Sequence, residues 1–238
     1  MNTILHIDTS GPDALIGISQ DLKIIASKQN SQSNTHGEFV QAGVDELFRD
    51  SAMQLKDIDA IAVTMGPGSY TGLRVGLASA KGLAFALNKP LIGLSTLTLL
   101  AKAAVGHLTA TENPLVNEKQ LQVFSMIDAR RMEIFGAIYN SSLEYLAAEK
   151  AMILDEALLL ALLSNGPLIC IGSGVAKTKI LTQHADFQNS SPLFLDYSYT
   201  IHDMAALAMI KFKAADFEDL AYSGPAYLKD YYQKPLIK

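Results

Sequence analysis

The sequence has no tryptophan, a single cysteine, and no uncharged apolar run approaching the ~20 residues that are needed to cross a bilayer. The single cysteine excludes an intrachain disulfide and is consistent with a reducing compartment. Cys170 lies in an apolar run, so we expect a buried, inert thiol rather than a nucleophile. The N-terminus lacks a basic region followed by a long hydrophobic region, which argues against a signal peptide. We therefore expect a soluble, cytoplasmic protein with no membrane contact.

An excess of positive charge is also missing. The formal net charge is −5, whereas a protein that binds nucleic acid by itself usually presents a basic surface to the phosphates. Autonomous nucleic-acid binding is therefore not expected. With 49% hydrophobic and 18% charged residues, the 238-residue chain can build a substantial core, either as one large domain or as two small ones.

The two halves of the chain repeat one order of predicted elements. Each half begins with three closely spaced strands and continues with alternating helices and strands. In the first half, we expect strands over 3–8, 14–19, 22–27, 58–64 and 90–94, and helices that begin near Thr35, Leu73 and Ser95. In the second half, we expect strands over 121–127, 133–139, 143–147, 167–171 and 192–195, and helices over 154–164, 175–184 and 201–214.

This repeated order predicts an α/β protein made of two ribonuclease-H-like lobes, as in the actin/Hsp70-type (ASKHA) fold. The expected division gives residues 1–105 to the first lobe. Residues 106–238 form a second, smaller or degenerate lobe with a C-terminal tail, and its segment 106–118 connects the two lobes.

A glycine-rich loop, residues 66–76, follows the predicted strand 58–64. It lacks the lysine of a P-loop, and it has one residue too many for the dinucleotide-binding pattern. Ser69 has Pro67 two positions before it, so the loop is also no serine nucleophile elbow. Two interpretations stay open: a tight turn into a closely packed helix, or a loop with a direct chemical role.

The helix after this loop is apolar on almost every face and carries two series of small residues. Gly72, Gly76 and Ala80 recur every fourth residue, and so do Ala78, Gly82 and Ala86. A glycine inside a helix is about 1 kcal/mol less favourable than alanine, so something should pack closely against this helix. Packing within the lobe and packing against a partner helix are both consistent with the pattern.

The run GPGSYTGLRVG at 66–76 resembles the hallmark of the TsaB (YeaZ) family, whose members are related to the TsaD/Kae1 proteins. The resemblance is strong over residues 1–100 and looser beyond, and Lys229 stands where the family more often has arginine. Supporting matches are the segment 4–10, His36 with Glu38, 128–130 with Glu133, 172–174, and Pro225 with Tyr227 and Leu228.

The resemblance implies a non-catalytic subunit. Proteins of this family associate with TsaD, and in many bacteria with TsaE. That assembly transfers threonylcarbamoyl from threonylcarbamoyl-adenylate to the adenosine beside the anticodon of tRNAs that read codons beginning with A. The implied partners are TsaD, TsaE and a second copy of this chain, and tRNA is reached only through the complex. The residues expected at the partner or dimer interface are His36, Glu38, Val40, Tyr70, Gly72, Arg74, Gly76 and Ala80.

The related ATPases suggest where a vestigial nucleotide cleft would lie. The expected residues are Asp8, Thr9, Ser10, Asp128, Arg130, Gly172, Ser173 and Gly174. The first turn lacks the glycines that let backbone N–H groups surround a triphosphate. We therefore expect no cofactor in the isolated chain and ATP or ADP only within a complex.

Other chemistry is weakly supported. Catalytic TsaD proteins resemble metal enzymes with paired histidines four residues apart on a helix, whereas here Val40 follows His36 at that spacing, so no metal site is expected. The enzyme alternative is an ATP-dependent small-molecule kinase of the same fold, which would depend on Asp8 and Asp128. A free-standing hydrolase lacks an activated nucleophile. The use of the tyrosine-rich end, 227–232, does not follow from the sequence.

Overall fold

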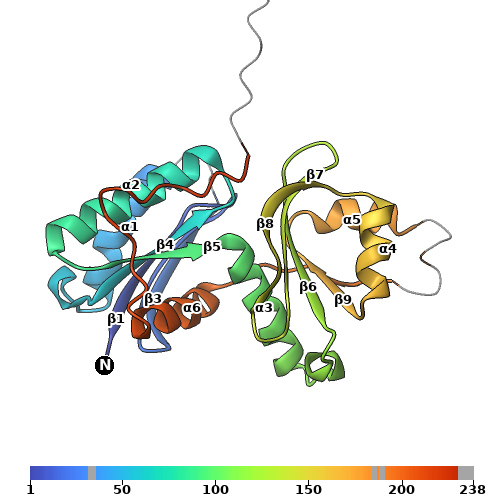
Figure 1. Ribbon diagram of the computed structural model, residues 1–238. Coiled ribbons are helices and arrows are strands. Elements are labelled where there is room, and N and C mark those ends of the chain that lie inside the picture. Colours follow the sequence, from blue (N-terminus) through green and yellow to red (C-terminus); the bar gives the residue numbers. More distant parts are fainter. Residues whose placement is uncertain (32–35, 184–186, 188–190, 230–238) are drawn as a thin grey trace, which may run out of the picture.

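The computed structural model describes residues 1–31, 36–183, 187 and 191–229. These residues form two lobes that lie side by side, each built on a five-stranded sheet (Figure 1). The two-lobed ASKHA-type α/β fold predicted from the sequence is confirmed.

The first sheet has the strand order β3-β2-β1-β4-β5. β1 pairs antiparallel with β2 and parallel with β4, and β2 pairs antiparallel with β3, so the three closely spaced N-terminal strands form an antiparallel meander. The strands are β1 (Thr3–Asp8), β2 (Ala14–Gln20), β3 (Lys23–Asn30), β4 (Ala60–Gly66) and β5 (Leu91–Ser95).

The second sheet repeats this arrangement with the order β10-β9-β6-β7-β8. β6 is the counterpart of β1, since it pairs antiparallel with β7 and parallel with β9. The strands are β6 (Gln122–Asp128), β7 (Glu133–Tyr139), β8 (Tyr145–Ile153), β9 (Leu168–Ile171) and β10 (Leu193–Leu195).

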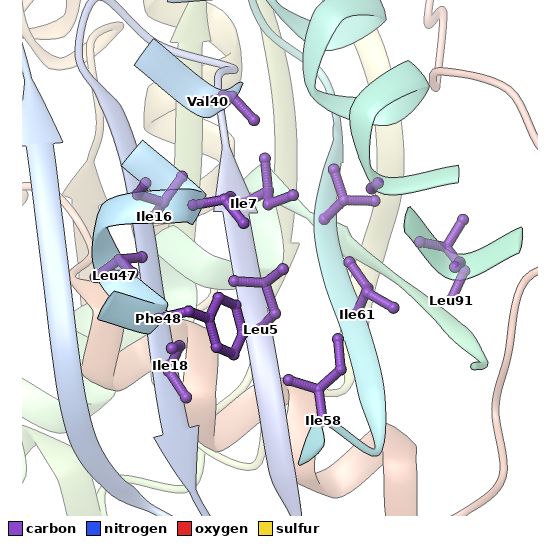
Figure 2. Packing of buried hydrophobic residues seen from close by; sticks show 14 of the residues in the cluster. Leu5, Ile7, Ile16, Ile18, Val40, Leu47, Phe48, Ile58, Ile61 and Leu91 are labelled. Atoms are coloured by element: carbon purple, nitrogen blue, oxygen red, sulfur yellow. The ribbon is translucent and has the colours of Figure 1, made fainter. Parts of the chain in front are cut away.

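Helices α1 (His36–Asp50) and α2 (Tyr70–Leu87) cover one face of the first sheet. Successive side chains of a strand point to opposite faces. Leu5 and Ile7 of β1 therefore pack with Val40 and Leu47 of α1 beneath these helices (Figure 2). The apolar residues of α1 thus face the core.

The other face of the first sheet is covered by α6 (Ile201–Lys213), which comes after the whole second sheet in the sequence (Figure 1). Met204 and Ala208 of this helix pack on Ile4 of β1 and Ile92 of β5. The packing therefore crosses the expected division into 1–105 and 106–238, because β1 is buried on both faces and α6 covers the second face together with Leu99.

Helix α3 (Thr96–Ala110) joins the two lobes. Leu99 packs with the first sheet, whereas Leu97 and Leu100 pack with Val123 and Ile169 of the second. Much of the expected connection 106–118 is helical, since α3 runs to Ala110 and the 3-10 helix η3 (Pro114–Asn117) follows it. The far face of the second sheet carries α4 (Glu156–Ser164) and α5 (Val175–Leu181).

Several boundaries differ from the prediction. α2 begins at Tyr70 rather than Leu73, because the Ser69 side chain accepts the Gly72 N–H and caps the helix. β8 extends six residues beyond the expected end at Ala147, reaching Ile153. Thr35 and His184, which were expected to start one helix and end another, lie outside the described residues. A short 3-10 helix, η2 (Leu55–Asp57), precedes β4.

The residues after α6 run back along the first lobe. The Glu218 N–H donates to Leu91 O of β5 at 2.8 Å, and the Ala226 N–H donates to Met65 O at 2.8 Å. In the described part of the chain, no helix combines the length and apolarity required to cross a membrane. Cys170 is fully buried in β9, and burial raises the pKa of its thiol.

His6 is a fully buried histidine in the middle of β1. Its Nε2 lies 2.8 Å from the Ser19 hydroxyl, and its Nδ1 has no partner. Burial lowers the pKa of the ring to about 3, because the charged form would lose its hydration. The folded protein therefore keeps His6 neutral.

This burial predicts a pH-dependent loss of stability. Below pH 6.5, the unfolded chain takes up a proton at His6 that the folded chain does not, so the free energy of unfolding falls by about 1.4 kcal/mol per pH unit until about pH 3. In His6→Gln, which can still bond Ser19, this component disappears. Urea unfolding of both proteins between pH 7 and pH 4 measures the difference, and parallel stability curves would contradict the assignment.

Candidate functional site

A cleft of about 800 Å³ lies between the two lobes. Its walls come from the turn after β1, the start of α1 and α2, the start of α3, the β6–β7 hairpin and the segment that leads from β10 to α6. Its lining residues include Ser10, His36, Ser69, Val75, Thr96, Asp128, Phe135, Ser173, Asp196, Tyr197, Ser198 and Tyr199.

The cleft brings together part of the expected nucleotide site. Ser10 comes from the first lobe, and Asp128, Gly172 and Ser173 come from the second; all of them line the cleft. The other expected residues do not line it. They are Asp8, Thr9, Arg130 and Gly174.

The carboxylate of Asp8 is fully engaged inside the protein. Its Oδ1 accepts the Thr64 hydroxyl at 2.7 Å and the Ser10 N–H at 2.8 Å, and its Oδ2 accepts the Tyr199 hydroxyl at 2.7 Å. The residue is only 4% exposed. Burial, and then the charge of Asp8, raise the pKa of Tyr199 well above its ordinary value, so Tyr199 remains a donor to Asp8. Each oxygen of Asp8 therefore already accepts at least one hydrogen bond from the protein.

The sequence did not predict the two hydroxyl side chains, Thr64 and Tyr199, that donate to Asp8. Thr64 could have been found, because β4 is the parallel neighbour of β1 and both strands end at the same edge of the sheet. Tyr199 lies 191 residues from Asp8 along the chain, and no local pattern marks it.

The turn after β1 is packed tightly against α2. The Thr9 hydroxyl donates to Gly72 O at 2.7 Å. A Cβ atom at Gly72 would lie 2.0 Å from Thr9 O, and one at Gly76 would lie 2.2 Å from Thr9 Oγ1. Only glycine fits at either position. The glycine loop therefore acts as a turn that delivers a closely packed helix, which was one of the two open interpretations.

The second lobe presents a polar hairpin at the cleft. Lys177 Nζ donates to Asp128 Oδ1 at 2.7 Å, and this hydrogen bond lowers the pKa of Asp128. Ser173 Oγ accepts the Asp128 N–H at 2.9 Å. Arg130 and Arg131 form the hairpin tip in left-handed conformations, with φ of 70° and 49°. Arg130 is exposed and lies outside the cleft lining.

The residues of the cleft do not fit a nucleoside triphosphate. Among the described residues that line it, none is lysine or arginine, and both lining aspartates are already paired outside it. Asp128 is paired with Lys177 and Asp196 with Lys179, at 2.7 Å and 2.6 Å. The side chains of Asp8 and Thr9 in the turn are already hydrogen-bonded within the protein.

Within the described ranges, no group of three or more His, Cys, Asp or Glu side chains is placed to hold an ion. His36 and Val40 of α1 are both buried, and His184 lies outside these ranges.

The expected interface residues divide into two sets. Glu38, Tyr70 and Arg74 are exposed. The others are buried; they are His36, Val40, Gly72, Gly76 and Ala80. Gly72 and Gly76 face the turn after β1, whereas Val40 lines a groove beside α1 and α2. Contact of these residues with a partner stays a prediction.

The second series of small residues on α2 faces outward. Ala78, Gly82 and Ala86 are exposed, and Phe85 beside them is 81% exposed. A groove of about 480 Å³ separates α1 from α2 next to this series. Its lining residues include Val40, Gln41, Val44, Asp45, Leu55, Ser79, Gly82 and Leu83.

The C-terminal residues contact two of the exposed interface candidates. Arg74 Nε donates to the Tyr227 hydroxyl at 2.8 Å, and its guanidinium lies 4.0 Å from the centre of the Tyr70 ring. The Tyr70 and Tyr227 rings are 5.4 Å apart. The first tyrosine of the tyrosine-rich end thus fastens the chain onto α2, whereas Tyr231 and Tyr232 lie outside the described residues.

Comparisons with known proteins agree on one family. The family model described as TsaD, tRNA N6-adenosine threonylcarbamoyltransferase, matches residues 23–236. The protein TsaB of Bacillus subtilis, which functions in tRNA threonylcarbamoyladenosine biosynthesis, is 30% identical over 173 residues, covering 71% of this chain and 70% of the relative.

Two further matches extend this result. An uncharacterized protein of Mycobacterium tuberculosis is 33% identical over 141 residues, covering 58% of this chain. The chain thereby spans 60% of the length of the first curated relatives it matches. The structure of YeaZ from Pseudomonas aeruginosa superimposes with a TM-score of 0.74 at 23% identity, covering 96% of this chain and 100% of that one, which shows the same fold.

The tight contact between Thr9 and α2 predicts opposite effects at two glycines of one helix. Gly76→Ala should destabilise the protein by about 1–3 kcal/mol, because the new methyl group overlaps Thr9 Oγ1. Gly82→Ala should stabilise it by up to about 1 kcal/mol, because its Cβ meets nothing within 4 Å and alanine favours the helix. Urea unfolding measures both, and equal stabilities for the two variants would contradict the packing described.

Proposed function

This chain belongs to the TsaB (YeaZ) family, within the wider TsaD family, and on that premise we propose that it is a non-catalytic subunit in the formation of N6-threonylcarbamoyladenosine in tRNA. It supports TsaD, which carries out the transfer of threonylcarbamoyl to the adenosine beside the anticodon. The observation that carries the proposal is the hydrogen bonding of Asp8, the acidic residue at the end of β1. Both of its carboxylate oxygens accept hydrogen bonds from hydroxyl groups of the protein itself.

The absence of a catalytic role is supported by the hydrogen bonds of the carboxylate at the end of β1. In the related ATPases the corresponding carboxylate serves the nucleotide, whereas here Thr64 and Tyr199 occupy it. The isolated chain uses no cofactor, and ATP or ADP takes part only within the complex. The kinase alternative needs a free carboxylate at Asp8 and finds no support in the relatives described above.

The partner surface is the outward side of α1 and α2. Phe85 at 81% exposure, the exposed small residues Ala78 and Gly82, and the apolar groove beside them form a surface against which a helix of a like-folded protein could pack closely. Glu38 lies on the same helix pair and adds a charge to its edge. TsaD is the functional occupant of this surface.

Other partners follow from the same surface and charge. A second copy of this chain uses similar helices, so a homodimer competes with the complex with TsaD. TsaE joins the assembly as a further component. The net charge of −5 supports contact with tRNA only through the complex.

A modification assay tests the role directly. Purified TsaD, TsaE, ATP, threonine, bicarbonate, the enzyme that makes threonylcarbamoyl-adenylate, and tRNA should form modified adenosine only when this chain is added. The chain alone should hydrolyse no ATP and form no product. Full modification without the chain, or turnover by the chain alone, would rule out the proposed role.

The partner surface is tested by a matched pair of glycines. Gly82→Glu and Gly106→Glu both add a charged side chain to a helix at a position where a Cβ meets nothing within 4 Å, so both variants should remain folded. Gly82 borders the groove, whereas Gly106 lies on α3, away from it. Co-purification with TsaD should be lost in Gly82→Glu and retained in Gly106→Glu. Retention in both would overturn the choice of surface.

A further inference from the structure

Basic side chains collect where strands of both lobes end. Arg130 and Arg131 form the tip of the hairpin that follows β6, and Arg74 lies near the start of α2, which follows β4. Lys177 lies near the start of α5, which follows β9, and Lys229 ends the described part of the C-terminal segment. These five residues are called the basic rim below.

Contacts bring the members of the basic rim in the second lobe together around one residue. Lys177 Nζ donates to Glu133 O at 2.8 Å, and Lys229 Nζ donates to the carboxylate of the same glutamate. The hydrogen bond from Lys229 lowers the pKa of Glu133, and the nearby charge of Arg131 lowers it further. The hairpin, the start of α5 and the C-terminal segment thus share one surface.

This surface continues onto the first lobe. Arg74 Nε donates to the Tyr227 hydroxyl at 2.8 Å, and Tyr227 precedes Lys229 by two residues, which span at most about 7 Å. The C-terminal segment therefore carries the basic rim from the hairpin to α2. Tyr70 and Tyr227 are 46% and 47% exposed, so their contacting rings add a partly exposed aromatic pair beside Arg74.

Positive charge is in excess on this surface. Asp128 is paired with Lys177 at 2.7 Å. Glu133 is paired with Lys229. Within the part of the chain that the structure describes, the three arginines of the basic rim form no ion pair, so their charges are left over. Because the whole chain has a net charge of −5, this local excess is a place where a polyanion is attracted to an otherwise acidic protein.

The hairpin tip holds its two arginines in an unfavourable backbone conformation. The φ angles are 70° for Arg130 and 49° for Arg131, in the left-handed region that glycine and asparagine adopt more readily than arginine. Both residues are exposed, so packing of their side chains does not offset this cost. A role for their charge accounts for arginine at these two positions.

The combination of free guanidinium groups and exposed rings fits RNA. Guanidinium groups form paired hydrogen bonds with phosphate oxygens. Aromatic side chains next to basic residues are surfaces on which unstacked bases lie, as the Tyr70–Tyr227 pair allows. RNA offers phosphates and planar bases together, whereas an anionic lipid surface offers charge without planar rings.

From these observations we propose that the basic rim contacts the sugar–phosphate backbone of the tRNA when this chain is part of the complex. Arg130 and Arg131 bind phosphates, and an unstacked base lies against the Tyr70–Tyr227 pair. The contact adds to RNA binding by the other subunits, because a chain with this net charge binds RNA weakly by itself. This inference rests on the proposed function, which brings tRNA to the complex.

A pair of double variants tests the contact. Arg130→Asn with Arg131→Asn removes two charges from the hairpin tip and places there a residue that suits the left-handed backbone. Lys119→Asn with Lys213→Asn removes two charges from exposed positions elsewhere. Lys119 precedes β6, and Lys213 ends α6 shortly before the chain bonds the start of β5, so neither lies at the strand ends that carry the basic rim.

The measurement is the fluorescence anisotropy of labelled tRNA titrated with the complex of this chain, TsaD and TsaE. In the tip variant, affinity at about 100 mM salt should fall at least about fivefold, and the slope of log affinity against log salt should become shallower by about 1–2. The control variant should stay within about twofold of the unaltered chain. Unchanged affinity in the tip variant, or an equal loss in the control, would overturn the assignment.

Two further measurements exclude indirect effects. The tip variant should unfold in urea at or above the midpoint of the unaltered chain, because asparagine relieves the backbone. It should also co-purify with TsaD as the unaltered chain does. A loss of tRNA affinity that is matched by a loss of folding or of TsaD would count against a direct contact.

The outcomes separate this inference from the proposed function. A complex that binds tRNA through the basic rim but forms no modified adenosine would contradict the function and keep the inference. A complex that modifies tRNA and binds it equally well with the tip variant would do the reverse. Vesicles containing phosphatidylserine test the other polyanion. Co-sedimentation of the unaltered chain with them, lost in the tip variant while tRNA affinity is kept, would overturn RNA as the partner.

Discussion

The close approach of α2 to the turn after β1 is the contact on which the first lobe depends. Thr9 lies against the backbone of Gly72 and Gly76, and no other residue type fits at those two positions. This contact fixes α2 over the sheet and directs Asp8 toward Thr64 and Tyr199, because the turn cannot move away from the helix. It also fills the place where the turn could otherwise have wrapped around phosphates.

The same contact decides which face of α2 is left for a partner. With one series of small residues held against Thr9, the second series, which includes Gly82, points away from the lobe beside Phe85. A helix with small residues on two sides can pack closely in two directions at once. In this way one helix both completes its own lobe and carries the outward surface that we propose for a partner.

The cleft and the partner surface are separate parts of the molecule. The cleft is closed on one side by the segment that leads from β10 to α6, and α6 then returns to cover the first sheet (Figure 1). Tyr199, at the start of that return, bonds Asp8. The two lobes are therefore joined twice. Helix α3 packs against both sheets, and the segment after β10 leads into α6, which packs on the first sheet.

Alternating and periodic apolar residues were enough to predict the two lobes and the order of their strands and helices along the chain, since these patterns are local. The sequence also predicted that something packs closely on α2, because glycines at 76 and 82 are unfavourable within a helix. It could not decide what packs there. The partner of Gly76 is Thr9, 67 residues earlier in the chain, and the partner of Asp8 is Tyr199, 191 residues later. Such pairs, and the return of α6 to the first sheet, are set by how the lobes pack in three dimensions, and no spacing along the chain encodes them.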